Sequence, residues 1–233
     1  MPRVGRVLLE LPPPVERRVA RRLNRFVVEL ESGERAYINN TGRLLDLLAP
    51  GRTCYCLPKP SGSTGLRLIA VEDEGGAALV DTRLQMAAFE RALELEALPW
   101  APCRVARRNP KLGSSTLDYL LECGGELVYA ELKSAALRVG CYAAYPDCPS
   151  LRGRRHIAEL ERLAERGGRA MVVFVAALPR VCAFRPYEEG DPEIPRLLRE
   201  AASKDVEIRS FSLHYEPSSS TVVLDKVEIP VVL

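Results

Sequence analysis

Hydrophobic and polar positions change their spacing near residue 80. Before that point the chain alternates short apolar runs with turn residues, and it shows no long helical pattern. Strands are predicted at residues 5–11, 26–30, 35–38, 50–57 and 66–71, the first of them ended by three prolines. Pro, Ser and Gly predict a loop at 59–65. Several short strands without a long helix favour a small, OB-like β-barrel.

Helices mix with strands from residue 81 onward. Apolar residues at helical spacing predict a helix at 84–98, with Leu84, Ala88, Ala92 and Leu95 on its buried side. Further helices are expected at 151–166 and from Pro192 to about 204, and the Val-rich run at 170–177 fits a strand buried on both faces. Strands at 117–122, 127–133, 181–184, 206–215 and 221–232 complete the pattern. We therefore expect two domains, an OB-like one at 1–80 and a mixed α/β one at 81–233.

Composition is that of an ordinary globular protein, with 47% hydrophobic and 27% charged residues. No apolar run is long enough to cross a membrane, and the first residues lack the apolar stretch of a signal peptide, so a cytoplasmic protein is expected. The seven cysteines contain no C-x-x-C pair, which argues against a structural zinc site. We interpret them as small buried side chains, with a Cys141–Cys148 disulfide as the alternative.

Charge is distributed unevenly along the chain. Residues 1–67 hold 12 Lys or Arg against 6 Asp or Glu, whereas the remainder holds 21 against 25. A basic first part suits a polyanion, and an acidic second part suits a cation. Arg18, Arg22 and Arg25 lie on a predicted strand that could follow a phosphate backbone. Aromatic residues are sparse there, and Phe26 is expected in the core, so backbone contacts are favoured over base stacking.

Three chemically suggestive residues surround a Gly-Gly pair. If Gly124-Gly125 form a two-residue hairpin turn, opposed residues have numbers that add up to 249. Asp118 and Glu131 satisfy that condition and should face each other on adjacent antiparallel strands. Lys133 follows two residues after Glu131 and should point to the same side of the sheet.

Two opposed carboxylates repel each other unless a cation lies between them. Oxygen ligands of this kind suit Mg²⁺ or Mn²⁺, which activates a water molecule for attack on a phosphate ester. Lys133 could orient or deprotonate that water, or stabilise charge on the phosphate. The parts predict a metal-dependent nuclease with Asp118, Glu131 and Lys133 as catalytic residues. A surface Glu-Lys pair near an unrelated Asp is the alternative.

The segments around these residues resemble the sugar fermentation stimulation protein (SfsA) family. The likeness includes Leu117-Asp118-Tyr119-Leu120-Leu121 and Tyr129-Ala130-Glu131-Leu132-Lys133-Ser134, and it continues in Tyr145-Pro146-Asp147, Arg152-Gly153, Arg155-His156 and Glu159-Leu160. Upstream it includes Arg22-x-x-Arg25-Phe26 and Asn40-Thr41-Gly42. The resemblance implies an OB-like N-terminal half, a PD-(D/E)XK, restriction-endonuclease-like C-terminal half, and DNA as the partner.

Two departures from that family pattern keep a second function open. Family members often carry an acidic residue shortly before the first strand of the site, about where Cys103-Arg104-Val105 stands here, and this chain has none there. Thr116 stands where an Arg is common in the family. The loss of the acid would leave one metal site rather than two, or a protein that binds DNA without cutting it. A non-catalytic DNA-binding protein that regulates sugar-utilisation genes is therefore the alternative, although no helix-turn-helix pattern supports a sequence reader.

Further residues are assigned supporting roles. On the 151–166 helix, Arg152, Arg155 and His156 share a stripe with Glu159 and could hold a phosphate near the helix N-terminus, or form a solvated face with local ion pairs. Asp147 could ligate metal or shape a turn after Pro146. A role for Asn40 and Thr41 facing the cleft follows from the family resemblance. The sequence is compatible with a homo-oligomer and requires no membrane.

Overall fold

The computed structural model describes residues 5–100 and 102–233, so most of the N-terminal stretch used for the signal-peptide prediction lies outside the described residues. The N-terminal barrel comprises β2 (Val15–Asn24), β3 (Val27–Leu30), β4 (Arg35–Tyr37), β5 (Thr53–Pro58) and β6 (Leu66–Asp73). Its strands follow the order β4-β3-β2-β5-β6, and a parallel pairing of β4 with β6 closes the barrel. Closure leaves this short sheet without a free edge, and it confirms the OB-like fold predicted from the turn pattern.

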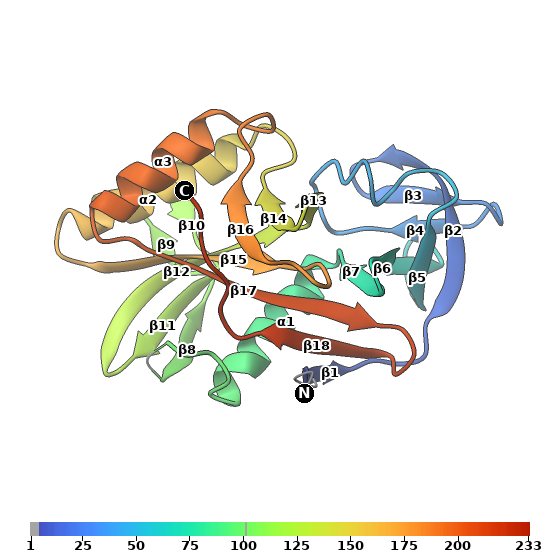
Figure 1. Cartoon of the computed structure of the whole chain (residues 1–233), viewed down its shortest axis with the longest axis horizontal. Coiled ribbons are helices and arrows are strands. Elements are labelled where there is room, and N and C mark those ends of the chain that lie inside the picture. Colours follow the sequence, from blue (N-terminus) through green and yellow to red (C-terminus); the bar gives the residue numbers. More distant parts are fainter. Residues whose placement is uncertain (1–4, 101) are drawn as a thin grey trace.

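The second domain is a mixed sheet covered by helices on both faces (Figure 1). Its strands are β17 (Glu207–Glu216), β15 (Arg169–Ala176), β12 (Glu126–Ala135), β11 (Tyr119–Cys123) and β8 (Cys103–Arg108), in that order. Helix α1 (Thr82–Glu94) packs on one face, and α2 (Leu151–Ala164) and α3 (Glu193–Ser203) pack on the other. Alternate residues of β15 enter each core, which confirms the prediction of a strand buried on both faces.

The two domains share one continuous sheet. Strand β7 (Gly76–Leu79) pairs with β6 on one side and meets β17 on the other, at Ala77 and Tyr215. Strand β1 (Arg6–Glu10) pairs with β18 (Thr221–Lys226), which pairs with β17. The first strand, expected in the barrel, therefore belongs to the sheet of the second domain. A strand is placed by the edge that its backbone can pair with, which local pattern does not reveal.

Smaller elements join the large ones. A two-stranded sheet contains β9 (Lys111–Leu112) and β10 (Ser115–Thr116), and a three-stranded sheet contains β13 (Leu137–Val139), β14 (Tyr142–Tyr145) and β16 (Ala183–Pro186). No described helix combines the length and apolar character needed to cross a membrane. The buried side of α1 is formed by Gln85, Ala88, Phe89, Ala92 and Leu93. Ala88 and Ala92 confirm the predicted side, and Leu84 and Leu95 pack against the same core while partly buried.

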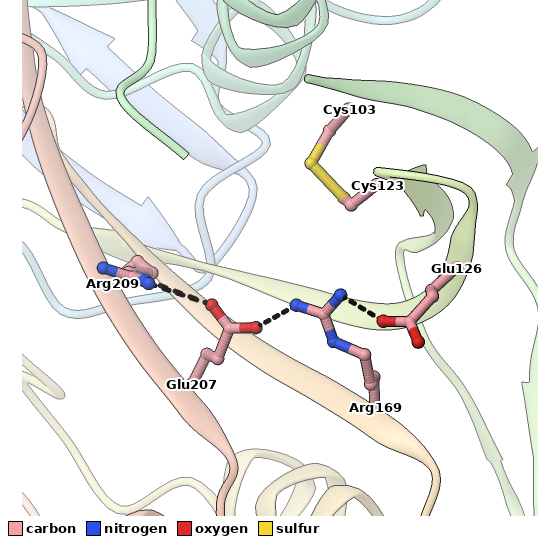
Figure 2. Close-up of a disulfide and its surroundings, with 6 residues drawn as sticks. All are labelled: Cys103, Cys123, Glu126, Arg169, Glu207 and Arg209. Atoms are coloured by element: carbon pink, nitrogen blue, oxygen red, sulfur yellow. Dashed lines mark hydrogen bonds and ion pairs between the residues drawn. A yellow bond between two sulfur atoms is a disulfide. The ribbon is translucent and has the colours of Figure 1, made fainter. Parts of the chain in front are cut away.

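Four cysteines form disulfides, contrary to the expectation of buried thiols. Cys103 pairs with Cys123 across β8 and β11, as Figure 2 shows. Cys141 pairs with Cys182, 41 residues away, and not with Cys148, which is a free thiol. Parallel pairing of β14 with β16 brings Cys141 and Cys182 together, a long-range contact that spacing in the sequence could not indicate.

Candidate active site

Strand β12 carries the acid and the lysine of the predicted site. It pairs with β15 from Val128 to Ala135, whereas β11 covers it only from Glu126 to Ala130. Beyond Ala130 one edge of β12 therefore has no strand partner from β11. Glu131 and Lys133 are on this overhanging part, both buried, with 3% and 8% of their surface exposed.

Asp118 takes the place of the missing strand partner. The ladder runs from Cys123 opposite Glu126 to Tyr119 opposite Ala130, which confirms the predicted register, and Asp118 is the next residue along the chain. Both turn glycines have positive φ, 59° at Gly124 and 86° at Gly125, as the tight hairpin requires. The Oδ2 atom of Asp118 accepts a hydrogen bond from the Leu132 amide at 2.9 Å. The carboxylate thus satisfies a backbone donor that would otherwise lack a partner.

The described residues bind Glu131 through one of its two carboxylate oxygens. Its Oε1 atom accepts hydrogen bonds from Nζ of Lys133 at 2.6 Å and from Nδ1 of His156 at 2.6 Å. Its Oε2 atom is buried and has no hydrogen-bond partner among the described residues. A buried carboxylate oxygen without a donor is costly, so this atom is the part of the site that invites a further ligand.

The charges around Glu131 act in opposite directions on the two carboxyl groups. Burial, followed by the negative charge of Glu131, raises the pKa of Asp118 to about 6. Burial also works against the charged form of Glu131, but Lys133 and His156 outweigh it and hold its pKa below the ordinary value. For Lys133, burial opposes the charge, yet the neighbouring carboxylate raises its pKa, which keeps the side chain an ammonium. Of the two carboxyl groups, Asp118 is therefore the one whose negative charge is less well stabilised by its surroundings.

His156 comes from helix α2, whose first turn is capped by the Ser150 side chain. The residue is 1% exposed, and its Nε2 atom accepts a hydrogen bond from Nε of Arg152 at 3.3 Å. Since Nε2 accepts, Nδ1 carries the proton and donates to Glu131. The predicted phosphate-binding stripe is thus divided: Arg152 and Arg155 are exposed, whereas the histidine faces the buried carboxylate.

Asn40 lies where the barrel meets the site, as the family resemblance implied. Its Nδ2 atom donates to the Val80 carbonyl at 3.2 Å and to Oγ of Ser134, the residue after Lys133, at 3.3 Å. Gln85 of α1 donates to the same Ser134 hydroxyl at 2.9 Å. Gln85 was missed in the sequence, although a polar residue within an apolar helix stripe could have indicated it. Thr41 is exposed beside Asn40.

Asp147 fastens the loop that follows Asn40. Its Oδ2 atom accepts a hydrogen bond from the Leu44 amide at 2.7 Å. A side chain at Gly42 would collide with it, because a Cβ there would lie 2.8 Å from Oδ1. The structure therefore uses Asp147 to hold the loop of the barrel against the second domain, and the carboxylate is engaged in a turn contact.

The three barrel arginines differ in what their side chains contact. The Arg22 guanidinium donates to five main-chain carbonyls, those of Asn24, Arg25, Asn40, Gly42 and Arg43. This set uses all five of its N–H groups, so Arg22 organises the loop and has no donor left for phosphate. Arg18 and Arg25 are exposed and form no ion pair among the described residues. They remain suited to contacts with an anion.

The donor set at the site is small. Within residues 5–100 and 102–233, no group of three or more His, Cys, Asp and Glu side chains is arranged to hold a metal ion. At the position where the family pattern has an upstream acid, this chain has Cys103, which forms the disulfide with Cys123. Asp118 and Glu131 are thus the two carboxylates that a cation could use, with its remaining ligands from outside the protein.

Comparisons with known proteins show which family this chain belongs to. A family model described as "Sugar fermentation stimulation protein RE domain" matches residues 83–219, and one described as "SfsA N-terminal OB domain" matches residues 20–80. The chain belongs to the sugar fermentation stimulation protein family. A homologue of that name from Pyrococcus furiosus is 51% identical over 219 residues, covering 92% of this chain and 95% of its own. One from Archaeoglobus fulgidus is 51% identical over 211 residues, covering 89% and 92%.

A solved structure in the family has the same fold. It is titled "The structure of Pyrococcus Furiosus SfsA in complex with Ca2+", and it matches with a TM-score of 0.94 at 48% identity. The match covers 98% of this chain and 100% of the other. The arrangement of barrel and mixed domain described above is thus the fold of this family.

Proposed function

We propose that this chain binds nucleic acid, with DNA as the expected substrate, and hydrolyses a phosphodiester bond with Mg²⁺ or Mn²⁺ held by Asp118 and Glu131. The unpartnered Oε2 atom of Glu131 carries the proposal. Its other oxygen is engaged by two donors, and the Asp118 carboxyl nearby has its pKa raised to about 6. The unpartnered oxygen of Glu131 and the raised pKa of Asp118 both reflect unfavourable surroundings for a carboxylate. A cation between the two carboxylates would relieve both.

The residues present fit a hydrated magnesium-type ion. Such ions are commonly bound through one or two carboxylates, with water and substrate phosphate as the other ligands. Two carboxylates, with no third ligand among the residues that the structure describes, agree with that preference. The related Pyrococcus furiosus structure is titled as a complex with Ca²⁺, which is also an oxygen-seeking cation. Bound at the carboxylates, a divalent cation polarises a phosphate oxygen and lowers the pKa of a water molecule.

The protein's own residues would share the remaining work. His156 and Lys133 hold Oε1 of Glu131, which leaves Oε2 directed toward a ligand. Lys133, as an ammonium, can stabilise negative charge on the phosphate and is unsuited to accept a proton from water. Arg152 and Arg155 are exposed on the same helix as His156 and can hold the substrate backbone. Arg18 and Arg25 would do the same from the barrel.

A second candidate function, DNA binding without cleavage, is favoured by one observation. Lys133 already neutralises Glu131, with Nζ 2.6 Å from Oε1, so the metal-free site tolerates this carboxylate. In that case the protein would bind nucleic acid without cutting it, and its proposed role would be to regulate sugar-utilisation genes.

A cleavage assay tests the proposal. Labelled single-stranded DNA, duplex DNA and RNA would be incubated with Mg²⁺, Mn²⁺ or Ca²⁺, and binding would be measured in parallel over a salt series. Glu131→Gln should abolish cleavage while binding persists. Glu122→Gln is the matched control, because Glu122 lies on the neighbouring strand and pairs with Arg104 away from the site. Absence of cleavage with all the metals, together with intact binding, would favour the second candidate.

A further inference from the structure

The turn between β2 and β3 exposes apolar side chains that the sequence pattern had placed elsewhere. Asn24 pairs with Val27, so Arg25 and Phe26 alone form the turn. Phe26 was expected in the core, but 45% of it is exposed, and Leu23 is 36% exposed. Val28 and Leu30 fill the barrel interior instead. A turn residue projects from the end of a hairpin, so Phe26 cannot follow the inward alternation of the strand.

The exposed ring stands on an ordered backbone. The Phe26 amide donates to Oδ1 of Asn24 at 2.8 Å, and its carbonyl accepts from the Ile38 amide at 2.9 Å. The Arg25 carbonyl is bound by Arg22 at 2.8 Å. The aromatic ring is thus presented from a turn with fixed peptide groups, and a ligand would bind it at little cost in backbone entropy.

Positive charge surrounds this turn. Arg25 and Arg43 are exposed, and neither forms an ion pair with any residue that the structure describes. Their carbonyls accept from the same Arg22 guanidinium, so their main chains lie close together. By contrast, Arg17 and Arg21, on the adjoining strand, are paired with Glu34 and Glu29. Among the residues that the structure describes, two cations without ion pairs, Arg25 and Arg43, therefore belong to the turn and to the loop beside it, and a further one, Arg18, lies on the strand.

The turn is also connected to the candidate active site. Arg22 binds the carbonyl of Arg25 and the carbonyl of Asn40 through the same Nη2 atom, at 2.8 Å and 2.9 Å. The Asn40 side chain in turn bonds Ser134, which follows Lys133 in β12. The turn thus lies on the part of the barrel that adjoins the second domain.

We propose that Phe26 is a stacking site for an unpaired nucleobase, with Arg25 and Arg43 binding the flanking phosphates. This inference rests on the proposed binding of nucleic acid and names the substrate class, which is single-stranded nucleic acid or a frayed end. In a duplex the base faces are covered by their neighbours, and the ring has no face to stack on. The free arginines select a polyanion over an uncharged apolar partner.

Substitutions at Phe26 test the proposal in the full-length protein. Affinity for a fluorescein-labelled single-stranded 20-mer and for a blunt duplex of the same length would be compared at several salt concentrations. Phe26→Ala should weaken binding to the single strand by roughly tenfold or more and change duplex binding little. Its salt dependence should be unchanged, because phosphate contacts remain. Phe26→Tyr should retain affinity, and the melting temperature should stay constant because the ring is exposed.

Leu127 supplies the matched control, since it is 55% exposed on β12. Leu127→Ala should bind both forms as the wild type does. Phe26→Trp should lose fluorescence when single-stranded DNA binds, whereas Leu127→Trp should not, and the native Trp100 is buried and common to both. Equal weakening of single-strand and duplex binding by Phe26→Ala, or no weakening, would overturn the stacking site while leaving nucleic-acid binding intact. Wild-type protein that binds neither form would overturn the proposed function itself.

Discussion

His156 donates from Nδ1 to Oε1 of Glu131 at 2.6 Å, although 25 positions separate the two residues in the chain. Both side chains are buried, and the packing of α2 against the sheet brings them together. The contact makes His156 a positioning residue for the carboxylate, in addition to Lys133. It suggests how the free oxygen of Glu131 is kept directed toward a ligand.

Removing the His156 donor should weaken metal binding. We expect His156→Ala to lower Mn²⁺ affinity about tenfold or more, because the carboxylate loses one of the two groups that orient it. His156→Asn, whose amide can donate from a similar position, should restore part of the loss. Calorimetric titration with Mn²⁺ would measure both. If alanine and asparagine behave alike, the ring acts only through packing.

Metal should stabilise the folded protein. Mg²⁺ or Mn²⁺ relieves repulsion between Asp118 and Glu131 that exists only in the folded state, so the melting temperature should rise with metal concentration. Asp118→Asn should remove most of that increase. An equal response in wild type and variant would show that the ion binds elsewhere.

The raised pKa of Asp118 makes stability depend on pH in the absence of metal. The folded-state pKa of about 6 exceeds the ordinary value of 3.8, so folding favours the protonated form. This stabilising contribution is complete below about pH 4 and is lost as pH rises through 6. Relative to Asp118→Asn, the wild type should lose on the order of 2 kcal/mol of unfolding free energy between pH 4 and 7. Denaturant titrations of both proteins in EDTA would measure the difference, and parallel curves would contradict it.

Lys133 should act on the reaction more than on binding. As an ammonium beside Glu131 it would stabilise charge that develops on the phosphate, so Lys133→Ala should lose metal-dependent cleavage and keep most of its DNA affinity. Cleavage rate and affinity would be measured on the same labelled DNA. A large loss of affinity, with no cleavage by the wild type, would instead make Lys133 a binding residue.

Substitution of Arg22 should affect the stability of the fold, whereas substitution of Arg25 should affect DNA binding. Arg22→Ala breaks five hydrogen bonds to main-chain carbonyls and should lower the melting temperature by several degrees. Arg25→Ala should leave the melting temperature unchanged, weaken DNA binding about equally across sequences and reduce its salt dependence. Thermal melts and a salt series would distinguish the two. A similar loss of stability in both variants would contradict the division.

The local sequence determined the features that depend on neighbouring residues. The Gly124-Gly125 turn set the register of β11 and β12, and so the positions of Asp118 and Glu131, because a two-residue hairpin fixes every opposed pair. The apolar run at 170–177 indicated a strand buried on both faces, and the turn spacing indicated the barrel. The family resemblance added the expectation of a restriction-endonuclease-like second domain with DNA as the partner, which composition and periodicity alone would have left open.

Only the tertiary structure decided which distant residues meet. Cys141 pairs with Cys182 because β14 and β16 are parallel neighbours, and β1 joins β18 because that strand offers a free edge. Arg22 stabilises the loop instead of contacting phosphate, because its guanidinium binds five main-chain carbonyls. The exposure of Phe26 followed from its place at the turn. Such contacts arise from the packing of whole helices and strands, so residue spacing along the chain does not predict them.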